Sequence, residues 1–161
     1  MTNKFTIQLG DKVKCNISEL EGRVTALERH IYSVDRVNVQ PPYNKESGTM
    51  PSGYTIDVTN IEVLEKSKLA VVHQYEDGPI ALGDEIKCTL SGVVGTVDRR
   101  ILNINGCYSL EIATRDSAGD PRHMKVEEKG CEVIKPIAET KTKPANRDTG
   151  CAMASTSGYG S

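Results

Sequence analysis

The sequence repeats itself, and this repeat limits what the chain can fold into more than any other feature. Residues 7–24 recur as residues 80–97, and nine of these eighteen positions are identical. The closing segments, 62–64 and 132–134, are 70 residues apart instead of 73, so the second copy is three residues shorter. A fixed period of this length indicates tandem copies of one supersecondary unit. We therefore expect two modules with the same fold.

Each copy has the alternating pattern of a half-buried β-strand. Apolar and polar residues alternate from Gln8 to Ile17 and again over the matching residues of the second copy. A period of two places every second side chain on the same face of a strand. The pattern predicts that one buried face holds Leu9, Val13, Cys15 and Ile17, with Ile86, Cys88 and Leu90 as their counterparts.

Glycine and proline mark the turns between these strands. Gly10-Asp11 and Gly83-Asp84 predict a turn before the first strand of each copy. Gly22 and Gly95 predict a bend or bulge where a side chain would not fit. Asn105-Gly106 predicts a hairpin closed by a type I′ turn. Irregular loops are expected over 40–54 and 115–124, and short closing strands near 61–64 and 131–134.

The motif from Gly83 to Val97 resembles a KOW-type unit of the SH3-like barrel class, and the first copy matches it except that Glu19 replaces Gly92. The resemblance implies an all-β fold. We expect two tandem SH3-like small β-barrels over residues 5–66 and 70–136. An extended low-complexity C-terminal arm over 137–161 follows, and its composition cannot form a core. We expect this arm to contact another chain.

Charge and hydropathy exclude several classes of protein. Residues 1–66 carry 8 basic and 9 acidic side chains, and residues 67–136 carry 9 and 11, so neither module has the excess of positive charge typical of nucleic-acid binders. No apolar run is long enough to span a membrane. The first five residues lack the apolar region of a signal peptide. We expect a soluble protein made in the cytosol.

KOW units often contact RNA or protein, so nucleic-acid binding is the alternative function. The basic residues that would carry it are Lys12, Lys14, Arg23, Arg29, Arg99 and Arg100. Acidic residues are interleaved with both groups, which favours a solvated face of mixed charge. An enzyme is the least favoured class. His30 near Asp35 and Glu28, or His73 near Glu76 and Asp77, could form acid–base pairs, but neighbours along a strand point to opposite faces.

The five cysteines do not form a disulfide framework, and no cofactor or metal site is expected. The sequence has no CxxC, and its three histidines do not pair with cysteine at zinc-finger spacing. Matched or aligned positions predict that Cys15, Cys88 and Cys131 are buried and lack access to a partner thiol. Cys107 and Cys151 are the candidates for intermolecular disulfides.

Tandem small modules, a low-complexity end and no catalytic constellation are similar to small accessory proteins of tailed bacteriophages. This resemblance implies a non-enzymatic structural protein of the virion. Capsid decoration or cement, or another component that bridges subunits, is the expected role. The expected partners are protein subunits of a large assembly, such as a capsid, rather than nucleic acid or a membrane.

Overall fold

The computed structural model describes residues 4–137, and their regular structure is β-strand apart from two short 3-10 helices. These residues form two compact units. Unit 1 comprises residues 4–29, 33–75 and 102–106, and unit 2 comprises residues 30–32, 76–101 and 107–137. Each unit is thus completed by a short segment from the other half of the sequence. Among the described residues, no helix is long and apolar enough to cross a membrane.

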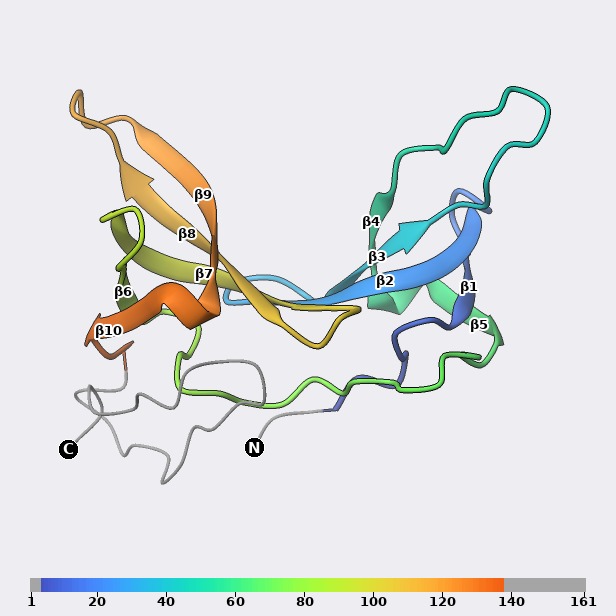
Figure 1. The fold of residues 1–161 in the computed structure, drawn as a ribbon, viewed down its shortest axis with the longest axis horizontal. Helices are drawn as coiled ribbons and strands as arrows, with labels where there is room; N and C mark the ends of the chain where they lie inside the picture. Colours follow the sequence, from blue (N-terminus) through green and yellow to red (C-terminus); the bar gives the residue numbers. More distant parts are fainter. Residues whose placement is uncertain (1–3, 138–161) are drawn as a thin grey trace. The chain divides into compact units, whose positions relative to one another are not determined.

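Unit 1 is an antiparallel sheet in the strand order β5-β1-β2-β3-β4 (Figure 1). Its elements are β1 (Lys12–Cys15), β2 (Glu21–His30), β3 (Arg36–Gln40), β4 (Tyr54–Asp57), the 3-10 helix η1 (Val58–Asn60) and β5 (Ile61–Glu65). The first and last strands, β1 and β5, pair directly, so the two ends of the repeat meet in one sheet.

Unit 2 has the same strand order, β10-β6-β7-β8-β9. Its elements are β6 (Glu85–Cys88), β7 (Val94–Asn103), β8 (Tyr108–Arg115), β9 (Pro121–Glu127), the 3-10 helix η2 (Glu128–Gly130) and β10 (Cys131–Lys135). Figure 1 shows β9 lying alongside β8 and leading through η2 into β10. The prediction that both copies share one strand order is confirmed.

The two cores are built from matched positions. Unit 2 buries Ile80, Ile86, Cys88, Val97, Leu110, Ile112 and Cys131 in one cluster. Unit 1 buries the counterparts of the first six, Ile7, Val13, Cys15, Val24, Val37 and Val39, each less than a tenth exposed, whereas Ile61, the counterpart of Cys131, is half-buried. Aliphatic side chains of similar size occupy corresponding positions, as expected when one small core is duplicated. Cys15, Cys88 and Cys131 are buried, as the alternation predicts.

In each copy, the buried face of the first strand ends two residues earlier than the sequence pattern predicts. Ile17 is 75% exposed and its counterpart Leu90 is 84% exposed. β1 ends at Cys15 and β6 ends at Cys88, so the chain has already turned before the next apolar residue. The expectation that Ile17 and Leu90 are core residues is therefore wrong, because alternation holds only while the strand continues.

Two loop predictions also need correction. The β7–β8 hairpin exists, but Asn105 does not have the positive φ that a type I′ turn requires. Instead Gly106 alone is left-handed, with φ of +91°, and its N–H donates to the Asn103 carbonyl at 2.9 Å. The loop expected over 115–124 is shorter, because β9 already begins at Pro121.

The bend glycines are confirmed as sites of close approach. A Cβ atom on Gly22 would collide with the carbonyl oxygen of Gln40, and one on Gly95 would lie 2.6 Å from that of Ala113. These contacts join the second strand of each copy to the end of the third at the same point. They also show that residues 95 and 113 correspond to residues 22 and 40, so the 73-residue offset applies across both strands.

Candidate functional site

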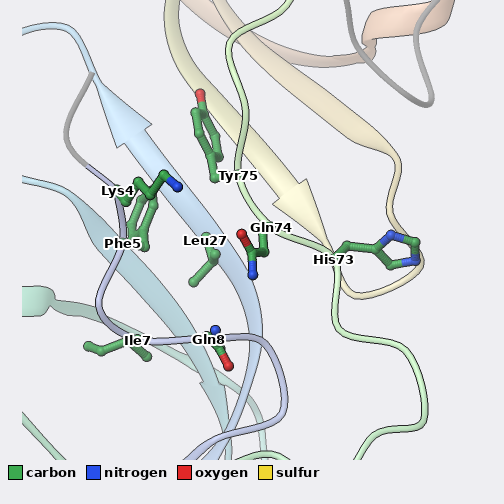
Figure 2. Close-up of a pocket in the computed structure, with 8 residues that line it drawn as sticks. All are labelled: Lys4, Phe5, Ile7, Gln8, Leu27, His73, Gln74 and Tyr75. Carbon is green, nitrogen blue, oxygen red and sulfur yellow. The ribbon is translucent and has the colours of Figure 1, made fainter. Parts of the chain in front are cut away.

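A pocket of about 250 Å³ lies in unit 1 between the N-terminal segment, β2 and residues 73–75 (Figure 2). Its apolar residues include Ile7 and Leu27, which are buried. Figure 2 shows the His73 ring turned away from Phe5 and Tyr75. A Cβ atom on Gly106 would lie 2.7 Å from this ring, so the imidazole packs against the chain there. His73 therefore packs against residue 106 within unit 1.

Arg29 closes the aromatic side of this region. Its guanidinium carbon lies 4.7 Å from the ring centre of Phe5 and 4.9 Å from that of Tyr75, and the two rings are 5.4 Å apart. Asp35 is 3.3 Å from the same guanidinium. Cation–π contacts and a carboxylate thus hold Arg29 in place. This arrangement joins Phe5 near the N-terminus and Tyr75 to β2 through the Arg29 side chain.

The carboxylates that flank His30 in the sequence have partners within the fold. The Glu28 carboxylate is buried and accepts a hydrogen bond of 2.7 Å from the Asn38 side chain. Asp35 pairs with Arg29.

Five of the six basic residues proposed for nucleic-acid contact form ion pairs with carboxylates. Arg100 is buried, and its Nε and Nη2 groups donate to the Glu128 carboxylate at 2.6 and 3.0 Å, while Nη1 donates to the Glu76 carbonyl at 2.6 Å. Arg99 lies 3.5 Å from Glu111. In unit 1, Arg23 lies 3.2 Å from Glu65, Lys12 lies 4.0 Å from Glu21, Lys14 is half-buried on β1, and Arg29 is held as described above.

The cysteines are arranged differently from the prediction in two respects. Cys88 and Cys131 are free thiols that lie directly opposite each other on β6 and β10, and their side chains interact. The expectation that the buried cysteines lack a partner thiol is therefore wrong for this pair, because sequence alternation gives no cross-strand register. Cys107 is half-buried just before β8 and is disulfide-bonded within the chain, so its thiol is not available for the predicted intermolecular disulfide. Cys151 lies outside the described residues.

A second hollow, which we call the β4 groove, runs along β4 in unit 1 and measures about 340 Å³. Its lining residues are Cys15, Ile17, Ser18, Leu20, Tyr54, Thr55, Ile56, Asp57 and Asn60. Tyr54 is 51% exposed, and β4 pairs with β3 alone among the described strands. The groove therefore combines an apolar surface with the open edge of a sheet, two features that bind extended segments of other proteins.

The second copy keeps the apolar residues of the β4 groove. The matching residues are Cys88, Leu90, Ser91, Val93, Met124, Lys125, Val126, Glu127 and Gly130. Four of the nine matched pairs are large apolar residues, and Leu90 and Met124 are exposed as Ile17 and Tyr54 are. A Cβ atom on Gly130 would lie 3.2 Å from Leu90, so this part of the surface is brought together in unit 2 as well. The alternation in the sequence did not predict this surface, because it assigned Ile17 and Leu90 to the core.

Comparison with known protein families, with characterised proteins and with solved structures finds no match.

Proposed function

We propose that the chain is a non-enzymatic structural protein of a bacteriophage particle, of the capsid decoration or cement type, which joins protein subunits. The observation that carries this proposal is the β4 groove and its matching residues in the second copy. A protein with two similar binding surfaces can hold two equivalent subunits of an assembly, and equivalent subunits are what a virion shell offers.

The exposure of Ile17 and Leu90 supports a role for these side chains in binding a partner rather than in stabilising the core. Leaving a large aliphatic side chain in water forgoes about 1.5–3 kcal/mol of burial free energy. One such residue at a surface needs no explanation, but the same exposed position in both copies, next to a second exposed pair at Tyr54 and Met124, does. Buried against a partner, these four side chains would form the apolar centre of two small interfaces.

We also propose that each unit is an SH3-like β-barrel. Five short strands in the order β5-β1-β2-β3-β4, with η1 before the last strand, support an SH3-like barrel for unit 1, and unit 2 repeats that order. The proposed C-terminal arm, 137–161, lies outside the described residues except for Ile137. We propose that the arm adds a further contact to a neighbouring subunit, by analogy with extended segments that bind along sheet edges.

The test is association of the purified protein with virions from the same source, measured by co-sedimentation. Ile17→Ser and Leu90→Ser should each weaken association, and the double variant should weaken it at least tenfold more than either alone, because two equivalent contacts act together. Val71→Ser is the matched control, since Val71 is 66% exposed and belongs neither to the β4 groove nor to the matching residues of the second copy. This control should associate like the wild type.

Two results would contradict the proposal. One is unchanged association of the double variant while its circular dichroism spectrum matches that of the wild type. The other is binding to single-stranded RNA at low salt that is lost at high salt, together with no binding to virions. That second result would instead support the nucleic-acid function.

A further inference from the structure

Three potential metal-ligating side chains come together on unit 2. They are Asp98 on β7, Glu111 on β8 and His123 on β9, and one ligand atom from each lies within 4.8 Å of the others. The His123 Nδ1 atom is 3.2 Å from Asp98 Oδ2 and 3.8 Å from Glu111 Oε2. Among the residues that the structure describes, this is the one mixed cluster of imidazole and carboxylate groups that meets this spacing.

Strand register explains why these residues meet. On the β8–β9 pair, His123 lies opposite Ala113, and Glu111 is two residues away from Ala113 on β8. Residues in this diagonal relation point to the same face of the sheet and lie within reach of each other. The cluster is therefore built on adjacent strands rather than on mobile loops, which is the kind of support that a precise binding site needs.

One polar atom of the cluster has no partner within the protein. Two carboxylates face one imidazole, and the nearby Arg99 guanidinium contacts the Glu111 carboxylate at 3.5 Å. The Asp98 Oδ1 atom is buried and has no hydrogen-bond partner. Buried polar atoms normally have a partner, so this atom indicates that the polar surroundings of Asp98 are incomplete.

The first copy shows that the fold does not require the cluster. The 73-residue offset places Thr25 and Asn38 where the second copy has Asp98 and Glu111, and the 70-residue offset after the loop places Gly53 at the position of His123. The same scaffold thus folds with no ionisable group at any of the three positions. The cluster is an addition to unit 2 rather than part of the duplicated core.

We propose that Asp98, Glu111 and His123 bind one divalent first-row transition-metal ion, with Zn²⁺ as the representative. Metal–ligand bonds of 2.0–2.2 Å in a tetrahedral site put ligand atoms roughly 3.3 Å apart, which the two histidine–carboxylate distances bracket. An imidazole ligand favours Zn²⁺ over Mg²⁺ and Ca²⁺, which prefer oxygen ligands alone. Water would complete the coordination. This inference does not depend on the proposed virion role.

The test is titration of the metal-free, full-length protein with Zn²⁺ by isothermal calorimetry, in the presence of excess Mg²⁺. We expect one saturable site per chain. Asp98→Asn and His123→Gln should each weaken binding tenfold or more, roughly the minimum for loss of a direct ligand. Glu132→Gln, which removes an exposed carboxylate from β10, is the matched control and should bind like the wild type.

A second variant separates loss of the site from loss of the fold. Arg99→Gln removes a positive charge that competes for Glu111, so it should tighten Zn²⁺ binding, an outcome that misfolding cannot produce. Co²⁺ substitution should give the visible spectrum of nitrogen and oxygen ligands, without a thiolate charge-transfer band. No saturable binding, equal binding by the Asp98→Asn and His123→Gln variants, or a thiolate band would each overturn the proposal.

Discussion

Glu19 occupies a backbone conformation that the second copy gives to a glycine. Its φ is +62°, and φ at the matching Gly92 is +83°. Both N–H groups close the same turn, donating to the carbonyls of Cys15 and Cys88 at 2.8 and 2.7 Å. For a residue with a Cβ atom, this left-handed conformation costs roughly 1–2 kcal/mol. The turn is therefore formed in both copies, but at a conformational cost only in the first.

Replacing Glu19 by glycine should accordingly stabilise the protein. We expect a gain of about 0.5–1 kcal/mol in the free energy of unfolding, because the relief of strain exceeds the extra freedom of glycine in the unfolded chain. Gly92→Ala should cost a similar amount, although open space surrounds the new Cβ atom. Urea unfolding measures both. A stability loss in Glu19→Gly as large as that in the strand control Glu21→Gly would contradict the argument.

The Cys131 thiol should make stability depend on alkaline pH. Burial raises the pKa of Cys131 to about 12. In the unfolded chain this thiol ionises near pH 8.5, so between these two values only the unfolded state releases its proton. The stability contributed by the neutral thiol is present below pH 8.5 and is lost as the pH rises towards 12.

The measurement compares urea unfolding at pH 8 and pH 10 for the wild type and Cys131→Val. We expect the wild type to lose more stability than the variant over this interval. The pKa of Cys88 is shifted the other way, lowered chiefly by a hydrogen bond with Ser91, and this hydrogen bond stays in both proteins. Equal losses in the two proteins would show that Cys131 ionises as easily when folded.

At the scale of elements, a buried aspartate ties the first turn of each copy to the segment after its last strand. Asp11 accepts hydrogen bonds from the N–H groups of Gln8 and Ser67, at 2.9 and 2.8 Å. Asp84 accepts them from Ala81 and Ile137, at 2.8 and 2.9 Å. Both carboxylates are fully buried. The identical Gly-Asp pairs of the sequence thus mark the point where the start of each copy is tied to its end.

Asp11→Asn and Asp84→Asn should each destabilise the protein by about 1–3 kcal/mol. An amide in place of the carboxylate turns an N–H donor towards one of the two backbone donors, which leaves a buried group unsatisfied. Because the two sites lie in separate units, the double variant should lose the sum of the single losses. Chemical denaturation checks this. The exposed control Asp120→Asn should change stability by less than about 0.5 kcal/mol.

At the scale of the whole molecule, the sequence predicts those features of the fold that depend on local patterns and on the repeat. The 73-residue repeat, the Gly-Asp turns and the alternating apolar residues are enough to predict an all-β chain with two copies of one strand order. The β4 groove and the Asp98, Glu111 and His123 cluster are not predictable in this way. Both depend on which strands pair and in which register, and the sequence spacing of His123 from its neighbours gives no sign of that.

The composition of the two units predicts how the whole chain unfolds. Unit 1 includes residues 102–106, and unit 2 includes residues 30–32, so a cut between Tyr75 and Glu76 removes a segment from each. In unit 1 the lost segment contains Gly106, against which His73 packs. Modules of this size bury a modest core and are marginally stable. Fragments 1–75 and 76–161 should therefore each be less stable than the full chain, and the full chain should unfold in one cooperative transition.

Calorimetry of the full chain and of both fragments tests this expectation. A single transition, with equal calorimetric and van't Hoff enthalpies, would support the exchange of segments as part of the fold. His73→Ala, which removes the ring that packs against Gly106, should lower the transition temperature of the full chain but not that of fragment 1–75, where residue 106 is already absent. Two independent transitions in the full chain, each matching one fragment, would mean instead that the repeats are self-sufficient domains and that the exchanged segments contribute nothing to stability.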